Sequence, residues 1–217
     1  MGDLNEYNFI LDASSLEKGL GNIKRWCQES RGKIVLRLYI PTYTLQELDF
    51  LKYKRKSFGA REALKFIDQA ISEYPDITVE FPETLDVVLW SEITSLVDGK
   101  QVDMLNRLPR RFKNLLKSCI YKCQLEENHL KWILVAEDTK VKELADICSI
   151  PCSSLVDAES TLSRETNKRQ YNESQKFNNL VQVKGTGESL IGGKKVVRTN
   201  FDNTVYASRG RGSLWEP

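Results

Sequence analysis

The chain has 217 residues, of which 41% are hydrophobic and 29% are charged, and its formal net charge is +2. This length supports one well-packed core and leaves little room for a second complete domain. No stretch approaches the ~20 consecutive apolar residues that span a bilayer, and the first residues lack the pattern of a secretory signal. We therefore expect a soluble intracellular protein without membrane contact.

The cysteine and histidine content excludes further classes. The five cysteines are an odd number without the C-x-x-C spacing of structural zinc sites, and the chain has one histidine, His129. A disulfide framework and a structural zinc site are therefore not expected. A Ser-His-Asp or Cys-His hydrolase is excluded as well, because this histidine has no evident nucleophile partner.

Short apolar runs alternate with amphipathic segments along the first three quarters of the chain. The runs with the length of buried strands are 7–11, 34–40, 77–81, 132–136 and 153–156. The segments in which apolar residues recur at three- and four-residue steps, as in helices, are 15–29, 43–53, 57–73, 84–97, 108–127 and 139–148. This alternation predicts an α/β fold with a central parallel sheet flanked by helices.

The pattern changes after residue 163. Residues 164–217 show no sustained periodicity and are rich in Asn, Gly, Ser and Lys, so they cannot bury enough apolar surface to fold alone. Bases outnumber acids by two to one in this segment, whereas acids outnumber bases before it. We expect a folded domain over 1–163 and a C-terminal extension over 164–217 that lacks regular structure when free.

Acidic residues stand near the ends of three predicted strands. Asp12 follows the first strand, Glu47 lies early in the helix after the second, and Asp138 follows the fourth. Residues past the carboxyl ends of parallel strands converge on one crevice, where carboxylates can share a divalent cation that activates water for attack on a phosphodiester. The alternatives are that Asp12 caps a helix and that Glu47 is a surface residue of its helix.

Two clusters of basic residues are candidate contacts for RNA. The cluster around the start of the third predicted helix comprises Lys52, Lys54, Arg55, Lys56 and Arg61. The cluster along the long helix near the crevice comprises Arg107, Arg110, Arg111, Lys113 and Lys117. Clustered cations attract a polyphosphate backbone without sequence preference, and the alternative for each cluster is a solvated helix face.

Four motifs in succession resemble the signatures of PIN domains: FILDAS, IPTYTLQELDFL, KNLLKSCIYKC and WILVAEDTKVKELA. PIN domains are metal-dependent ribonucleases built as a three-layer sandwich of a parallel sheet between helices, and the resemblance covers about residues 7–163. It implies that Asp12, Glu47 and Asp138 correspond to metal-site acids, with Asp157 as a more remote addition. An active site of this family would use Mg²⁺ or Mn²⁺.

The chain departs from the PIN pattern at the start of the long helix. The resemblance to active PIN domains implies an acid at the position where this chain has Asn114. The residue before it here is Lys113. Asparagine keeps a carbonyl ligand but loses the negative charge, and the lysine repels a cation. We therefore expect a vestigial crevice, weak or absent nuclease activity and no required cofactor. The alternative is a metal-dependent endoribonuclease acting on single-stranded RNA.

The whole chain resembles the fungal PIN-domain factors of nonsense-mediated mRNA decay. The segments that carry this resemblance include LEKGLGNIKRWC, IPTYTLQELDFLKYKRKSFGAREALKFID and VVRTNFDNTVYASRGRGSLWEP. The resemblance implies a cytoplasmic accessory factor that binds and modulates the RNA helicase of that pathway through its extension and its PIN body. RNA, bound without sequence preference through Lys54, Arg55, Lys56, Arg110, Arg111 and Lys113, is a second expected partner.

The C-terminal extension contains side chains suited to binding a partner. A segment that becomes ordered on a partner can cover a large surface, with aromatic and arginine residues supplying most of the binding energy. The candidate partner-binding residues are Arg198, Phe201, Tyr206, Arg209, Arg211 and Trp215. The alternative is a solvated tail with a basic bias.

Overall fold

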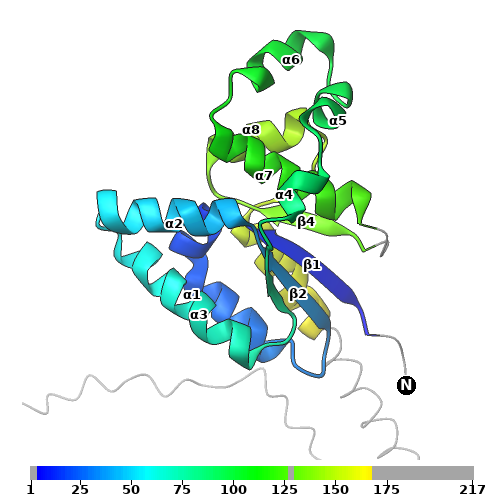
Figure 1. Cartoon of the computed structure of the whole chain (residues 1–217). Helices are drawn as coiled ribbons and strands as arrows, with labels where there is room; N and C mark the ends of the chain where they lie inside the picture. The colour runs from blue at the N-terminus through cyan, green and yellow to red at the C-terminus, as the bar shows by residue number, and fades with distance from the viewer. Residues whose placement is uncertain (1–3, 127–129, 168–217) are drawn as a thin grey trace, which may run out of the picture. The chain divides into compact units, whose positions relative to one another are not determined.

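The computed structural model describes residues 4–126 and 130–167. Over these residues the chain forms one parallel sheet with strands in the order β3-β2-β1-β4-β5 (Figure 1). The strands are β1 (Glu6–Leu11), β2 (Val35–Ile40), β3 (Ile77–Val79), β4 (Trp132–Val135) and β5 (Cys152–Ser153). The chain order reverses between β1 and β4, and the crevice outside the carboxyl ends of these two strands is the usual location of a site in such sheets.

Helices connect the strands and cover both faces of the sheet. The labelled helices are α1 (Ala13–Glu29), α2 (Thr42–Lys54), α3 (Phe58–Glu73), α4 (Thr84–Val87), α5 (Trp90–Ser95), α6 (Gly99–Asn106), α7 (Arg110–Ile120) and α8 (Thr139–Ile147). A π-helical turn, η1 (Tyr121–Leu125), extends α7, and a further helix covers 155–167. Among the described residues, none of the helices combines the length and the apolar character needed to cross a membrane.

Two hydrophobic cores lie on opposite faces of the sheet because successive strand residues point to opposite sides. Phe9 and Leu11 of β1 belong to the core that α1, α3 and the helix 155–167 cover, whereas Ile10 belongs to the core that α7 and α8 cover. Figure 1 shows α1 and α3 side by side against one face. The expected three-layer α/β sandwich is therefore confirmed.

Several element boundaries differ from those that the sequence pattern predicts. The single helix expected over 84–97 is two short helices, α4 and α5, separated by the buried and extended Val88. The strand expected over 153–156 is shorter, because Ser154 starts a helix. The Ser154 hydroxyl accepts a hydrogen bond from the backbone N–H of Asp157 (3.1 Å) and donates one to its carboxylate (2.6 Å). This reciprocal cap begins the helix 155–167, which runs past residue 163.

Candidate functional site at the carboxyl edge of the sheet

Asp12 lies at the end of β1 and caps α1. Its Oδ2 accepts hydrogen bonds from the backbone N–H (3.1 Å) and the hydroxyl (2.5 Å) of Ser14. The side chain is 1% exposed, and its Oδ1 is buried without a hydrogen-bond partner among the described residues. Burial raises the pKa of the Asp12 carboxyl, and the charge of Asp138 adds to this increase.

Ser14 joins the ends of the two central strands. Besides donating to Asp12, its hydroxyl oxygen accepts hydrogen bonds from the backbone N–H groups of Glu137 (2.8 Å) and Asp138 (3.0 Å), just past β4. One serine therefore fixes the loop after β4 against the start of α1. The crevice predicted from the strand ends is built around this contact.

Asp138 is exposed and acts as the N-cap of α8. Its Oδ1 accepts a hydrogen bond from the backbone N–H of Val141 at 3.1 Å. The neighbouring Glu137 is also engaged, since it accepts a hydrogen bond from the backbone N–H of Leu155 (2.7 Å) and pairs with Lys142 (3.7 Å). Asp157, the remote candidate, is exposed, and its carboxylate accepts a hydrogen bond (2.6 Å) from Ser154, the residue that caps the helix 155–167.

Glu47 projects from α2 and forms an ion pair with Arg111 of α7. The distance between Arg111 Nη1 and Glu47 Oε2 is 3.0 Å. Tyr43 is buried one helical turn before Glu47. Burial raises the pKa of its phenol, and the negative charges of Asp12 and Glu47 raise it further. Asp138 also contributes to this increase. The three predicted acids therefore surround one region of the fold.

The three acids do not fit the divalent cation that the PIN resemblance implies. Among the described residues, no group of three or more His, Cys, Asp or Glu side chains is arranged to hold a metal ion. Asp12 offers one unpartnered oxygen, but Glu47 is paired with Arg111 and an oxygen of Asp138 caps α8. In this arrangement each of the three carboxylates already has a hydrogen-bond or ion-pair partner for one of its oxygens.

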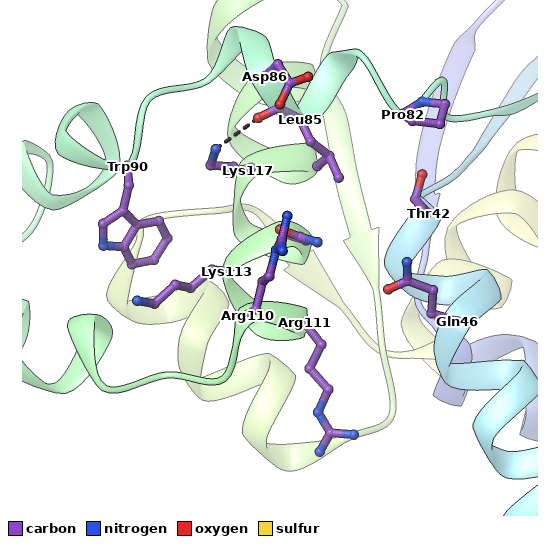
Figure 2. A pocket seen from close by; sticks show the side chains of 11 residues that line it. Thr42, Gln46, Pro82, Leu85, Asp86, Trp90, Arg110, Arg111, Lys113 and Lys117 are labelled. Carbon is purple, nitrogen blue, oxygen red and sulfur yellow. Dashed lines mark hydrogen bonds between the residues drawn. The ribbon is translucent and has the colours of Figure 1, made fainter.

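A groove of about 880 Å³ opens between α2, α7 and the segment from Pro82 to Trp90 (Figure 2). Its lining includes Asn114, the residue at the position of the missing acid. The lining cations are Arg110, Arg111, Lys113 and Lys117, and the single lining carboxylate is Asp86. The structure thus brings most of the second basic cluster together, whereas Arg107 does not line the groove.

Trp90 forms one wall of this groove. The Lys113 ammonium lies 5.0 Å from the centre of the Trp90 ring and donates a hydrogen bond to the carbonyl of Asn106 (2.8 Å). The indole N–H of Trp90 donates to the side chain of the same Asn106 (2.8 Å). Figure 2 shows Arg110 extending into the groove and Arg111 pointing the opposite way. The side chain of Arg110 has no hydrogen bond or ion pair with another described residue.

Sequence reasoning missed three residues of this region: Ser14 as the link between strand ends, Tyr43 and Trp90. Tyr43 carries a usable signal, because it lies one helical turn before Glu47 and so on the same face of its helix. Trp90 carries none, since an aromatic residue in an amphipathic segment is most often a core residue. The cluster Lys54, Arg55 and Lys56 lies at the turn between α2 and α3 and does not line the groove.

Comparisons with known proteins establish the family. The PIN domain family matches residues 8–156, and the family described as "Nonsense-mediated decay protein 4, C-terminal domain" matches residues 170–204. The chain is 52% identical to Nonsense-mediated decay protein 4 of Saccharomyces cerevisiae, over 99% of this chain and 100% of that protein. The chain belongs to the nonsense-mediated decay protein 4 family.

Other members of the family align as completely. The chain is 48% identical to Nonsense-mediated decay protein 4 of Candida glabrata, over 99% of this chain and 100% of that protein. It is 36% identical to that of Kluyveromyces lactis, over 97% of this chain and 96% of that protein. Among solved structures, the PIN domain of human SMG5 aligns over 71% of this chain and 97% of that chain, with a TM-score of 0.42 and 12% identity.

The family assignment confirms the resemblance noted in the sequence. The chain is a nonsense-mediated decay factor with a PIN domain. The C-terminal match shows that part of the extension belongs to the family's own pattern and contains Arg198 and Phe201. The remaining candidates in the extension, Tyr206, Arg209, Arg211 and Trp215, follow the matched segment, and all six lie outside the described residues.

Proposed function

We propose that this chain is a non-catalytic accessory factor of nonsense-mediated decay, which binds and modulates the RNA helicase of the pathway through its C-terminal extension and its PIN domain. In this role the acidic crevice is vestigial and no metal cofactor is required. The proposed site of action is the cytoplasm. RNA is a second proposed partner, contacted without sequence preference through basic surfaces of the PIN domain.

The main support for a non-catalytic PIN domain is the ion pair between Arg111 and Glu47, in which the nitrogen and oxygen atoms are 3.0 Å apart. Arg111 lies on α7, the helix on which Asn114 replaces the expected acid. A guanidinium at this distance compensates the charge that Glu47 would offer to a cation and repels the cation itself. The ion pair therefore disfavours the binding of a divalent cation at the crevice.

The charge of the adjoining groove supports the same conclusion. Besides Arg111, which is paired with Glu47, three cations and one carboxylate line it, so its potential is positive at neutral pH. Such a potential attracts the phosphates of RNA and repels a divalent metal ion. The groove is consequently better suited to holding a polyanion than to assembling a metal centre that cleaves one.

Support for the helicase half of the proposal comes from the sequence of the extension. Residues 170–204 match a pattern of this family, and that segment includes two of the candidate partner-binding residues, Arg198 and Phe201. Arginine and aromatic side chains supply most of the energy in protein interfaces. A basic segment of this composition is suited to becoming ordered on a partner rather than to folding alone.

One observation favours a second function, a metal-dependent endoribonuclease. Oδ1 of Asp12 is buried and has no hydrogen-bond partner among the described residues. Buried polar atoms are nearly always satisfied, and a cation is one way of satisfying a carboxylate oxygen. An enzyme of this kind would need Mg²⁺ or Mn²⁺ and would use Asp12 as its central ligand.

A cleavage assay separates the two functions. Purified full-length protein is incubated with labelled single-stranded RNA and excess Mn²⁺, beside the variants Asp12→Asn and Asp98→Asn. We expect no cleavage by the wild type above the level of Asp12→Asn, because Glu47 is held by Arg111. Asp98→Asn removes an exposed carboxylate that does not line the groove and so controls for charge. Cleavage by the wild type and Asp98→Asn, lost in Asp12→Asn, would establish the nuclease instead.

A further inference from the structure

Three aromatic side chains are exposed around the turn that joins α2 to α3. Phe50 and Tyr53, on α2, are 42% and 69% exposed, and Phe58, the first residue of α3, is 72% exposed. Single exposed apolar residues are ordinary, but three exposed rings so close together in the sequence call for an explanation. Exposed rings offer flat faces on which nucleic acid bases can stack.

Cations separate and flank these rings. Residues 50–61 contain no carboxylate. The cations of this turn are Lys52, Lys54, Arg55, Lys56 and Arg61. None of them takes part in an ion pair with another described residue. The Lys52 ammonium lies 4.7 Å from the centre of the Tyr53 ring, which holds a cation and a stacking surface together.

The turn is fixed in place by hydrogen bonds and by close packing on α1. The backbone N–H of Ser57 donates to the carbonyl of Leu51 (3.1 Å), and its hydroxyl accepts from the N–H of Ala60 (3.2 Å). The same hydroxyl donates to Glu17 of α1 (2.6 Å). A Cβ on Gly59 would lie 2.6 Å from the carbonyl oxygen of Glu17, so the backbones are in contact. A surface held in this way loses little conformational entropy on binding.

The turn is separate from the crevice and its groove. None of the residues 50–61 lines the groove. In Figure 1 the turn stands at the end of α2 opposite the end that abuts the sheet. A ligand bound there would therefore not need the acidic residues of the crevice.

We propose that the α2–α3 turn, residues 50–61, binds single-stranded RNA by stacking bases on Tyr53 and Phe58 and pairing phosphates with the surrounding cations, an inference that rests on the RNA binding proposed above. An acidic protein surface is the competing occupant, but lysine is depleted in protein interfaces and three of the five cations are lysines. The chain's own extension carries an excess of bases, so charge repulsion disfavours it as the occupant. Alternating rings and lysines match the requirements of a nucleic acid strand.

Fluorescence anisotropy with a labelled oligouridine, at low salt and with the full chain, tests this surface. Tyr53→Ala/Phe58→Ala is expected to weaken binding roughly tenfold or more, because stacking on both rings is lost. Lys54→Glu/Lys56→Glu is expected to weaken it by a similar factor and to reduce its salt dependence. Both pairs of residues are exposed, so the fold is retained, which circular dichroism verifies.

Matched variants make the result decisive. Phe81→Ala removes an equally exposed ring outside the turn, and Lys18→Glu/Lys100→Glu reverses two exposed cations elsewhere, and neither is expected to change the affinity. An equal loss in the lysine control would show a net-charge effect and overturn the proposal. Unchanged binding by Tyr53→Ala/Phe58→Ala would also overturn it. In that case, a loss of affinity in Arg110→Glu/Lys113→Glu would assign RNA binding to the groove. Unchanged affinity in that variant as well would leave contact with the helicase as the role of the rings.

Discussion

Asp12 and Glu47 have different environments at the carboxyl edge of the sheet. Asp12 is almost fully buried, and Ser14 provides hydrogen bonds to one of its two oxygens. Glu47 is half-buried and paired with Arg111. A divalent cation attracted by Asp12 would meet a guanidinium beside the next carboxylate. The crevice therefore combines a buried acid that has one unpartnered oxygen with a second carboxylate that is already paired.

The raised pKa of Asp12 leads to a prediction about stability. A carboxyl whose pKa is higher in the folded state favours folding when protonated, and this contribution is lost as the pH rises from its usual pKa through the raised one. Asp12→Asn removes the buried charge and keeps a helix-capping side chain. We expect the variant to be more stable than the wild type by about 1–2 kcal/mol at neutral pH.

Urea denaturation of the two proteins across the acidic to neutral range measures this difference. The gain should shrink as the pH falls from the raised pKa to below the usual pKa of an aspartate, because the wild-type carboxyl is then protonated in both states. A gain that is the same at all pH values, or a loss at neutral pH, would show that burial of the charge is not what raises the pKa.

For single residues, the sequence predicts where a side chain stands relative to a strand better than it predicts which side chain it pairs with. The place of Asp12 and Asp138 after their strands follows from the apolar runs that precede them. The ion pair of Glu47 with Arg111 could not be predicted, because it joins α2 to α7 and depends on how these helices pack. The sequence predicts Glu47 as a metal ligand, whereas the packing of the two helices makes it the partner of Arg111.

At the scale of the elements, the contact of α1 with α3 depends on a glycine. Gly59 lies so close to the backbone of Glu17 that an added Cβ would be 2.6 Å from its carbonyl oxygen, whereas nothing lies within 4 Å of a Cβ on Gly21 of α1. The two glycines thus form a matched pair, one packed and one open. The packed position allows the α2–α3 turn to rest on α1.

Alanine substitutions at these two glycines should change stability in opposite directions. Gly59→Ala is expected to lower the free energy of unfolding by about 1–3 kcal/mol, because the backbones must separate. Gly21→Ala should raise it by about 0.5–1 kcal/mol, since an exposed helical glycine is replaced by a better helix former. Thermal denaturation followed by circular dichroism measures both. A Gly59→Ala protein as stable as the wild type would contradict the close approach of α1 and α3.

The elements that the sequence pattern predicts are those with a strong periodicity. Strands buried on both faces read as continuous apolar runs, and four of the five were located close to their observed bounds. The helix α6 was missed because it is short and largely exposed, with Leu105 as its one buried residue. The helix 155–167 was missed because its cap, Ser154, lies inside the segment 153–156 that was interpreted as a strand.

At the scale of the whole molecule, the family resemblance extends over both parts of the chain. The PIN domain matches residues 8–156, and the C-terminal pattern matches residues 170–204. Periodicity alone could indicate only that the second part lacks a core, because a segment that binds a partner needs no internal packing. The function proposed for the extension therefore depends on its composition and on the family, and the described fold provides the domain to which it is attached.

The rate of ATP hydrolysis by the pathway's helicase, measured as the full-length chain is titrated in, tests the proposed function most directly. We expect a saturable change in the rate that persists with Asp12→Asn, because the crevice is not used. Arg198→Ala/Phe201→Ala should abolish the change or shift it to much higher concentrations, whereas the control Asn178→Ala/Asn179→Ala, in the same matched segment, should leave it intact. An unchanged rate with the wild type, or a change that Asp12→Asn removes, would contradict a non-catalytic factor that acts through its extension.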